Sequence, residues 1–390
     1  RRSSDLLEPV RRRPGMYIGG TDERALHHLV VEILDNAMDE AVAGHASRID
    51  IMLHDNGSVS VRDNGRGIPI DPHPKFPDKS ALQVILTTLH SGAKFGGQSY
   101  KTSGGLHGVG LSVVNALSER LIVEVYSNRV IWRQEYAEGH PLTPLENKGA
   151  TPNRRGTLIT FWPDPKIFGA DARFKPTLLY KIARSKAYLF KGVTIHWQCD
   201  EQLCEDKVPT EAIFHFPGGL SDYLKEVLAG VPLATPTSFG GEANFPDGEG
   251  RVEWAIAWPL EGDGGCTSYC NTIMTPEGGT HENGFRQAMV RGLRAYGERV
   301  GNKRAAQLTA EDCIGSASCV LSVFMRDPQF QGQTKEKLVS QDASRLVESS
   351  LKDHFDHWLT ANPEAAHSLL DYVFLQMEDR LRRKQSKEIS

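Results

Sequence analysis

Apolar residues recur at helical spacing between Arg24 and Gly44. They follow one another at intervals of three and four residues, which predicts an amphipathic helix with one buried face. The apolar positions of this segment are Leu26, Leu29, Val30, Ile33, Ala37, Met38 and Ala41. Thr21 or Asp22 can cap the start of the predicted helix, and Gly44 can end it.

Polar residues form a stripe along the same predicted helix. Glu32, Asn36 and Glu40 lie at positions i, i+4 and i+8, so they stack on one side. A carboxylate one turn away from a carboxamide suits a site where the first activates water and the second binds Mg²⁺. Considered alone, the stripe is more typical of a solvated helix face.

Alternation of apolar and polar residues between Arg48 and Arg62 predicts a β-hairpin around the turn Asp55-Asn56-Gly57. The alternating apolar residues are Ile49, Ile51, Leu53, Val59 and Val61. The hairpin leads into Asp63-Asn-Gly-Arg-Gly67, where two glycines let a flat ring approach the backbone. The Asp63 carboxylate can accept a hydrogen bond from an exocyclic amine such as that of adenine. By itself, D-x-G-x-G is also common in plain loops.

Glycine, serine and lysine dominate residues 91–110. Successive glycines let backbone N–H groups point at phosphate oxygens, and a predicted helix from Leu111 to Leu117 would aim its positive N-terminus at the same anion. Lys94 and Lys101 add positive charge. The segment is neither the G-x-x-x-x-G-K-[ST] P-loop nor a Rossmann fingerprint within a βαβ unit. A flexible surface loop is the alternative interpretation.

The pattern changes after Pro217-Gly-Gly219, which predicts a boundary between domains 1–216 and 217–390. In the second domain we expect a loop over Ala234 to Gly250 and a helix that Thr280 caps. The other predicted elements are strands Arg251–Trp258, Thr267–Ile273 and Ser318–Met325, and helices up to Val300, over Ser340–Thr360 and over Asn362–Lys384. Strands that cross to helices suggest a βαβ arrangement in an α+β domain.

Composition narrows the class of protein. The 390 residues are 39% hydrophobic and 24% charged, which is ordinary for globular proteins of about two domains. A net charge of −4 excludes a global cationic field for nucleic acid. No apolar run reaches the roughly 20 residues of a membrane span, and no signal peptide opens the chain. The six cysteines match no common zinc spacing, so we expect a cytoplasmic protein with free thiols. A first residue other than Met suggests a fragment.

Together these motifs resemble the ATPase region of the GHKL superfamily and, within it, the B-type subunit of bacterial type II topoisomerases. The matching segments are Arg13-Pro-Gly-Met-Tyr-Ile-Gly19, Glu32–Asn36, Asp63–Pro69, Lys94-Phe95, Tyr100–Gly110, Gly156-Thr157 and Gln333-Thr-Lys335. Asp327–Lys335 is more similar to the topoisomerase IV member of this group than to the gyrase member. The resemblance implies an α+β fold: a GHKL (Bergerat) sandwich of helices on a mixed sheet, then a ribosomal-S5-like βαβ transducer domain that ends in long helices.

The resemblance implies roles for residues around the base and the metal. Glu32 would be the general base that orients and polarises water, and Asn36 would hold Mg²⁺ on the triphosphate. Asp63 would accept from the adenine amine, helped by a bound water and by Thr157. Arg66 would stack near the base while pairing with Glu40. The floor of the pocket would consist of Gly67, Ile68 and Pro69.

Further roles implied by the resemblance concern the phosphates. Lys94 and one backbone segment would cradle them, with Tyr100 and Lys101 on the lid. That segment consists of Gly104, Gly105, Leu106, His107, Gly108, Val109 and Gly110. From the second domain, Gln333 and Lys335 would touch the γ-phosphate, where negative charge gathers during phosphoryl transfer. Hydrolysis would remove this contact and let the two domains rotate.

One position departs from the family pattern. An Arg usually follows in the strand after Leu121, and Ser127 occupies its place here. Arg129 is a candidate substitute for the contact, which matters to coumarin-type inhibitors. The basic helix end from Arg380 to Lys387 suggests a passage for DNA, and a plain favourable interaction with the helix dipole explains it equally well.

The function implied is Mg²⁺-dependent ATP hydrolysis that clamps two copies into a homodimer, with N-terminal residues swapped between them. In the whole enzyme, with the topoisomerase A subunit, this gate would drive passage of double-stranded DNA, and so decatenation and relaxation. With no Toprim-like acidic metal site, we expect no DNA cleavage by this chain. The alternatives are a gyrase B fragment, a chaperone or mismatch-repair ATPase, and a nucleotide-sensing module or histidine kinase.

Overall fold

The structure is a computed structural model that describes residues 6–89, 110–205, 207–332 and 335–390. The chain forms two compact units, Arg1–Pro217 and Gly218–Ser390. Each unit has a hydrophobic core of its own. None of the helices described is both long and apolar enough to cross a membrane.

Nine strands form one mixed sheet among the described residues of the first unit. Their order is β5-β4-β3-β7-β2-β1-β8-β9, with β6 paired to β4. The bounds are β1 Arg48–Leu53, β2 Val59–Asp63, β3 Ser118–Ser127, β4 Val130–Ala137, β5 His140–Pro141, β6 Glu146–Ala150, β7 Gly156–Pro163, β8 Thr194–Cys199 and β9 Glu211–Phe214. β1 pairs with β2 in antiparallel and with β8 in parallel orientation, which confirms the predicted hairpin.

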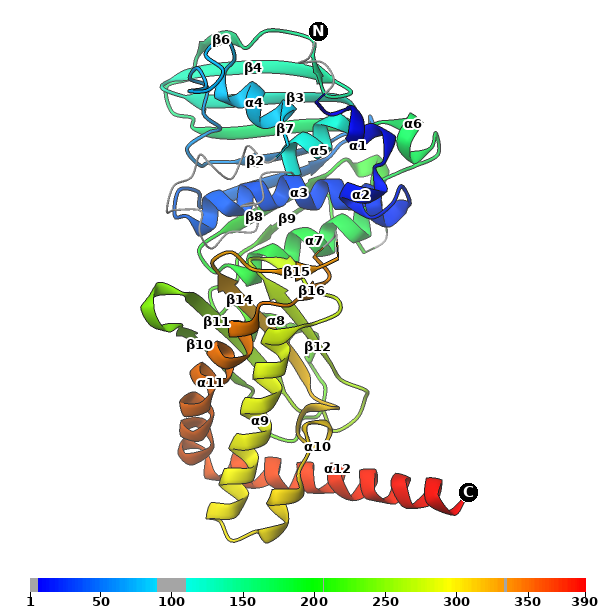
Figure 1. The fold of residues 1–390 in the computed structure, drawn as a ribbon, viewed down its shortest axis with the longest axis vertical. Helices are drawn as coiled ribbons and strands as arrows, with labels where there is room; N and C mark the ends of the chain where they lie inside the picture. Colours follow the sequence, from blue (N-terminus) through cyan, green and yellow to red (C-terminus); the bar gives the residue numbers. More distant parts are fainter. Residues whose placement is uncertain (1–5, 90–109, 206, 333–334) are drawn as a thin grey trace. The chain divides into compact units, whose positions relative to one another are not determined.

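Helices cover one face of this sheet, with α3 and α5 crossing it (Figure 1). The bounds are α1 Glu8–Arg12, α2 Gly15–Ile18, α3 Glu23–Val42, α4 Ala81–Thr87, α5 Gly110–Ala116, α6 Pro165–Phe168, α7 Pro176–Leu189 and the 3₁₀ turn η4 Glu201–Leu203. α3 confirms the first predicted helix, and Asp22 caps it by accepting a hydrogen bond of 3.0 Å from the Ala25 amide. Its apolar face packs on the sheet through residues such as Leu29 and Ile33.

A second sheet of five strands lies among the described residues of the second unit, in the order β10-β11-β14-β12-β13. The bounds are β10 Phe239–Asn244, β11 Gly250–Ala257, β12 Gly265–Cys270, β13 Ile273–Met274 and β14 Ser318–Met325, with a separate hairpin of β15 Phe330–Gln331 and β16 Lys337–Leu338. β12 and β14 are parallel. The helices α9 and α10 lie between them in the chain, so the predicted βαβ arrangement is confirmed.

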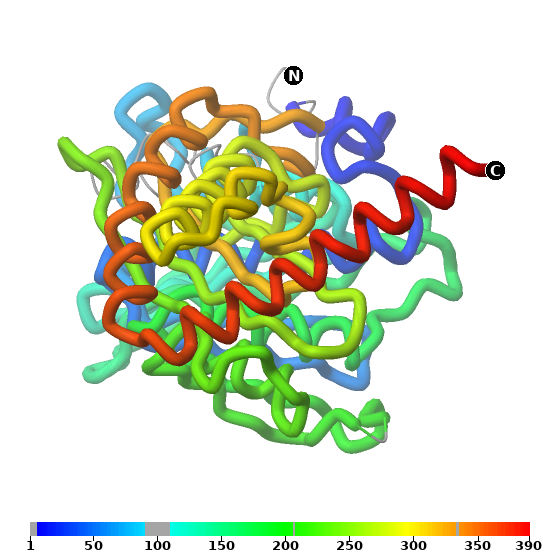
Figure 2. The backbone as a smooth tube through the Cα atoms, turned by 90° about the horizontal axis from the view of Figure 1, so that it is seen from below, coloured from blue at the N-terminus to red at the C-terminus, as the bar shows by residue number. Residues whose placement is uncertain are grey.

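The helices of the second unit are α8 Leu220–Val227, α9 Thr280–Arg299, α10 Ala310–Ile314, α11 Gln341–Ala361 and α12 Pro363–Ile389, with 3₁₀ turns η5 Pro246–Gly248 and η6 Lys303–Gln307. α9 and α11 pack against each other through buried residues that include Phe285 and Phe355. The last part of α12 extends beyond the other elements of its unit in both views (Figures 1 and 2). The two predicted terminal helices are thus confirmed.

Three expectations for the second unit are wrong. The predicted loop Ala234–Gly250 contains β10, which pairs with β11 along its whole length. The single strand expected over Thr267–Ile273 is a hairpin of β12 and β13, because Asn271 and Thr272 both have a left-handed backbone and reverse the chain. Thr280 is not a cap, since the N-cap of α9 is Gly279 and no side chain caps this end.

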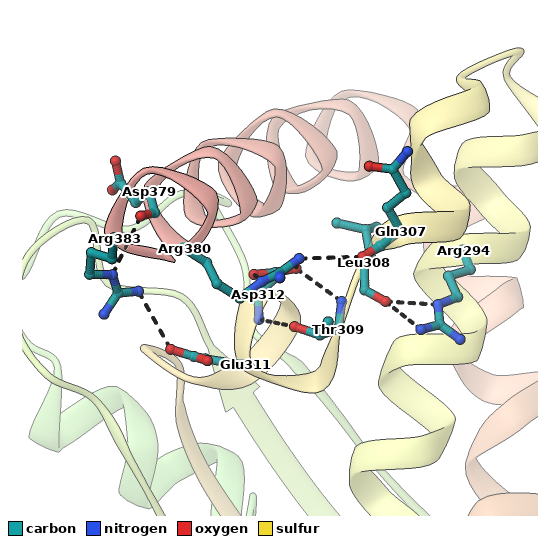
Figure 3. Close-up of polar contacts among 9 residues, drawn as sticks. All are labelled: Arg294, Gln307, Leu308, Thr309, Glu311, Asp312, Asp379, Arg380 and Arg383. Carbon is teal, nitrogen blue, oxygen red and sulfur yellow. Dashed lines mark hydrogen bonds and ion pairs between the residues drawn. The ribbon is translucent and has the colours of Figure 1, made fainter. Parts of the chain in front are cut away.

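The basic end of α12 is partly engaged inside its own unit (Figure 3). Arg380 makes two hydrogen bonds to the buried Asp312 of α10, at 2.8 and 3.1 Å. Asp312 also closes a capping box with Thr309. Arg383 reaches Glu311 at 3.4 Å, so these two arginines hold α12 against α10.

Candidate functional site

The site in the first unit begins with α3, which presents Glu32 away from the core. The Glu32 side chain is 22% exposed, and its Oε1 lies 3.0 Å from Nε2 of His28, one turn earlier on the helix. On another side of α3, Asp35 forms a buried ion pair with Lys186 of α7, at 2.7 Å. The helix that carries Glu32 is therefore fixed to the body of the unit.

Gly110, the first residue of α5, closes against the same carboxylate. A Cβ atom at this position would lie 2.4 Å from Oε2 of Glu32. Only glycine allows such an approach without a shift of the glutamate side chain. The structure thus brings Glu32 to the residue that ends the predicted glycine-rich phosphate segment.

Glu40, two turns after Glu32, pairs with Arg66 as the resemblance implies. Its Oε2 accepts the Arg66 amide at 2.9 Å, and its Oε1 accepts from the guanidinium at 2.8 Å. Gly65 lies directly beside this pair, since a Cβ atom there would come within 2.5 Å of Glu40 Oε2. The stripe of α3 is therefore joined to the loop that follows β2.

Asp63 ends β2 and is only 3% exposed. It accepts a hydrogen bond of 2.8 Å from the Gly65 amide. Burial raises the pKa of its carboxyl group to about 7, the Gly65 bond counteracts this, and the nearby Glu40 charge raises the pKa further. A donor group from a ligand would favour the charged carboxylate.

β7 completes the wall around Asp63. Thr157 is the strand partner of Asp63, and its hydroxyl oxygen accepts the Ile68 amide at 3.0 Å. The preceding Gly156 has a φ of +125°, and a Cβ atom there would lie 1.9 Å from the Asp63 carbonyl oxygen. Gly67, with a φ of +85°, approaches Val125 of β3 in the same way. Asp63, Gly67, Ile68 and Thr157 are thus brought together.

Ser127, at the position of the usual family Arg, lies two residues after Val125 on β3 and so faces the same side of the sheet. Arg129 stands in the exposed turn that follows, with a φ of 64°. The intervening Tyr126 is contacted by two other arginines, Arg62 and Arg154, whose guanidinium carbons lie 5.3 and 5.5 Å from the ring centroid.

The other predicted residues are placed as follows. Pro69 is exposed at the end of the loop that contains Gly67 and Ile68. Lys335 belongs to the second unit. Outside the described residues lie Lys94, Tyr100, Lys101, Gly104, Gly105, Leu106, His107, Gly108, Val109 and Gln333.

His28 is a residue that the sequence interpretation missed. It contacts the Glu32 carboxylate from the preceding turn of α3. The signal was its position four residues before Glu32, because side chains at i and i+4 of a helix are neighbours.

Asn36 is the residue suited to a metal ion. It is half-buried on α3, on the same side of the helix as Glu32. Mg²⁺ is commonly held by one or two protein oxygens together with substrate phosphates and water, so a single carboxamide oxygen fits this ion. The described residues contain no cluster of three or more His, Cys, Asp or Glu side chains that could hold a metal by themselves.

Two family descriptions match the chain. "Histidine kinase-, DNA gyrase B-, and HSP90-like ATPase" matches residues 21–167, and "DNA gyrase B" matches residues 219–389. The first match lies within the first compact unit, and the second begins at the start of the second unit.

Curated relatives cover almost the whole chain. The B subunit of DNA topoisomerase 4 from Caulobacter vibrioides is 54% identical over 98% of this chain, and the B subunit of DNA gyrase from Chlamydia pneumoniae is 39% identical over 98%. The chain spans 56% of the length of the first relative and 48% of the second.

Solved structures share the fold. The 43K ATPase domain of Thermus thermophilus gyrase B, in complex with an aminocoumarin, has a TM-score of 0.79 and 34% identity, and the alignment covers 98% of each chain. The topoisomerase IV ATP-binding domain of Francisella tularensis, in complex with a small-molecule inhibitor, has a TM-score of 0.78 and 33% identity over 96% of this chain and 98% of that one. These neighbours confirm the expected α+β fold. The chain therefore belongs to the family formed by the B subunits of DNA gyrase and topoisomerase IV, the GHKL-type ATPases of type II topoisomerases, and is more similar to the topoisomerase IV member.

Proposed function

We propose that the first unit binds ATP with Mg²⁺ and hydrolyses it, and that Glu32 is the general base. The observation that carries this proposal is the position of the Glu32 carboxylate, which His28 contacts on one side and Gly110 on the other. A carboxylate held at the end of a glycine-rich phosphate segment is in place to polarise water beside the terminal phosphate. His28 would keep it in that orientation.

The remaining residues of the site would bind and orient the nucleotide. Asp63 would accept the adenine amine in a pocket with Thr157 and the Gly67–Pro69 floor, and Arg66, held by Glu40, would lie beside the base. Asn36 would hold Mg²⁺, which when bound supplies positive charge to the phosphate oxygens.

A second group of residues would hold the phosphates. Lys94, Tyr100, Lys101 and the segment up to Gly110 would surround them. Lys335, with Gln333, would bring the charge of the second unit to the γ-phosphate. The first unit would thus be the ATPase domain, and the second the transducer domain.

In the whole protein we propose an ATP-driven gate of a topoisomerase IV-like enzyme. A second copy of the chain would be the dimer partner, and the A subunit and double-stranded DNA would complete the assembly for strand passage. The names of the relatives support this role, and the higher identity to the topoisomerase IV relative favours it over gyrase. Six free cysteines suit a reducing cytoplasm.

Inhibitors of the aminocoumarin type would bind in the same pocket. The aminocoumarin complex of the Thermus thermophilus gyrase B domain supports this proposal. Ser127 cannot supply the charged contact of the usual Arg, so we expect such inhibitors to bind this chain more weakly than proteins that have it.

The test of the base is Glu32→Ala. Loss of the base should lower kcat by about 100-fold or more, since general-base catalysis contributes about 10²- to 10⁴-fold. Affinity for a non-hydrolysable ATP analogue should change little, because Glu32 acts on water and not on the nucleotide. Glu23→Ala, an exposed glutamate on the first turn of the same helix, is the matched control and should leave kcat unchanged. Undiminished hydrolysis by Glu32→Ala would refute the assignment.

A further inference from the structure

The segment just before α9 lies against the hairpin of β15 and β16, which carries Lys335. We propose that Gly278 and Gly279 act as positioning residues for hydrolysis, because they fix the backbone from which the Lys335 amine extends. This inference rests on the proposed role of Lys335 at the γ-phosphate.

Lys335 has an unusual backbone. Its φ is 59°, a left-handed conformation that costs a residue with a side chain roughly 1–2 kcal/mol. Its amide donates to the Gly332 carbonyl at 3.3 Å, and its Nζ lies 5.9 Å from the ring centroid of Phe330. A strained backbone conformation persists only where the surrounding structure enforces it. Contacts next to Lys335 should therefore hold this residue in its left-handed conformation.

The hairpin of β15 and β16 is held at its base from two sides. Phe330 pairs with Leu338 across the hairpin. On the other side, the Glu277 amide donates to the Glu336 carbonyl at 2.9 Å and the Leu338 amide donates to the Gly278 carbonyl at 3.0 Å. Gly279 forms a parallel bridge with Leu338, whose side chain is fully buried. The residue directly after Lys335 is therefore bonded to the segment before α9.

Glycine is required for this contact. Gly279 has a φ of +140°, and a Cβ atom there would lie 2.1 Å from the Leu338 carbonyl oxygen and 2.7 Å from its amide nitrogen. Both are backbone atoms, so the clash is relieved only if β16 moves. At Gly278, with a φ of +70°, the Cβ atom would meet the carboxylate of Glu282, 2.1 Å away, which can rotate aside. Gly279 therefore tolerates a side chain less well than Gly278 does.

A buried histidine holds the segment before α9 in place. His281 is fully buried, and its Nε2 lies 3.0 Å from the Thr275 hydroxyl oxygen. The same hydroxyl also lies 3.0 Å from the Ser268 carbonyl oxygen of β12, so the histidine and the strand share one hydroxyl group. Burial lowers the pKa of His281 to about 3, which keeps the ring neutral. The segment that holds the Lys335 hairpin is therefore connected to the five-stranded sheet of the second unit.

The test compares Gly279→Ala, Lys335→Ala and the double variant. Gly279→Ala should lower kcat for ATP by about 100-fold, because small displacements of a charged group from the transition state have effects of this size. ADP affinity should stay within about twofold of the wild-type value, since ADP lacks the γ-phosphate. If both residues act through the same amine, the double variant should be no slower than Lys335→Ala.

Gly301→Ala is the matched control. Gly301 also has a positive φ, of +83°, but a Cβ atom there meets nothing within 4 Å. The control also places an alanine at a positive φ but without the clash, and should hydrolyse ATP as the wild type does. Far-UV circular dichroism and thermal unfolding identify any variant that fails to fold.

Hydrogen exchange of the wild-type protein tests the contact even if Gly279→Ala does not fold. The Leu338 and Glu277 amides should exchange slowly, as bonded amides do. Fast exchange at both would overturn the proposal, as would wild-type kcat for a folded Gly279→Ala, or additive losses in the double variant.

The outcomes separate this inference from the proposed function. Normal hydrolysis by Lys335→Ala would remove the assumed role of Lys335, and with it the basis of both statements. Impaired hydrolysis by Lys335→Ala together with normal hydrolysis by Gly279→Ala would refute only the positioning role of the glycine.

Discussion

The carboxyl group of Asp63 is shielded from water, and its pKa of about 7 means that a substantial fraction is protonated near neutral pH. The folded chain holds this proton more tightly than the unfolded chain does. Its stabilising effect is therefore fully present below the ordinary pKa of an aspartate and is lost as the pH rises through about 7. The stability that is lost belongs to a buried carboxylate that could accept a hydrogen bond from a bound ligand.

Asp63→Asn should remove the pH dependence that this group causes. The variant should be more stable than the wild type above pH 7 by up to about 4 kcal/mol, an upper bound from about 1.4 kcal/mol per pKa unit. The difference should shrink as the pH falls toward about 4. Urea unfolding at several pH values measures it, with the exposed Asp171→Asn as control. A constant difference at all pH values would contradict the shifted pKa.

At the scale of elements, the anchoring of α3 can be tested through its ion pair with α7. Asp35 and Lys186 are 7% and 5% exposed, so removal of one partner leaves a buried charge. We expect Asp35→Ala to lower the free energy of unfolding by about 3–5 kcal/mol. The double change Asp35→Leu with Lys186→Met should recover most of that loss, because no charge remains unpaired.

The same two helices offer a matched control. Glu23 at the start of α3 pairs with Lys175 at the N-cap of α7, and these side chains are 48% and 53% exposed. Exposed pairs contribute about 0–1 kcal/mol, so Glu23→Ala should have little effect in urea unfolding. Equal losses for Asp35→Ala and Glu23→Ala would show that burial is not what makes the inner pair important.

Elements with local signals were predictable from the sequence. α3 has both a clear helical period and a capping residue, Asp22, and β14 is a mostly apolar run from Ser318 to Met325. The pairing of Glu40 with Arg66 could be expected only through the family resemblance, because 26 residues separate them.

Elements that depend on distant partners were not predictable. β10 contains Gly240 and Gly241, which favour a loop. It forms a strand because it pairs with β11, where the ring of Trp254 lies 2.7 Å from the place of a Cβ atom on Gly241. Thr280 has the right chemistry for a cap, but Gly279 takes that place because it bridges to Leu338, about sixty residues later.

At the scale of the whole molecule, the proposed clamp requires two copies of the chain. The ATPase rate should therefore rise more steeply than in proportion to protein concentration while most of the protein is monomeric, and should become proportional once dimers dominate. Hydrolysis assays over a dilution series measure this dependence. The solution mass should double when a non-hydrolysable ATP analogue is added. A strictly proportional rate and an unchanged mass would argue that one copy suffices.

His281 can be used to test whether nucleotide binding to the first unit affects the second unit. Its ring is neutral, contacts the Thr275 hydroxyl through Nε2, and lies in the segment that holds the Lys335 hairpin. Most histidines change their magnetic resonance signals with pH in the physiological range, but the signals of His281 should stay constant over this range. Any movement of its nitrogen resonances when nucleotide is added to the intact chain would then report a rearrangement of its surroundings. A single native ring thereby serves as a built-in reporter of whether an event in one unit has reached the other.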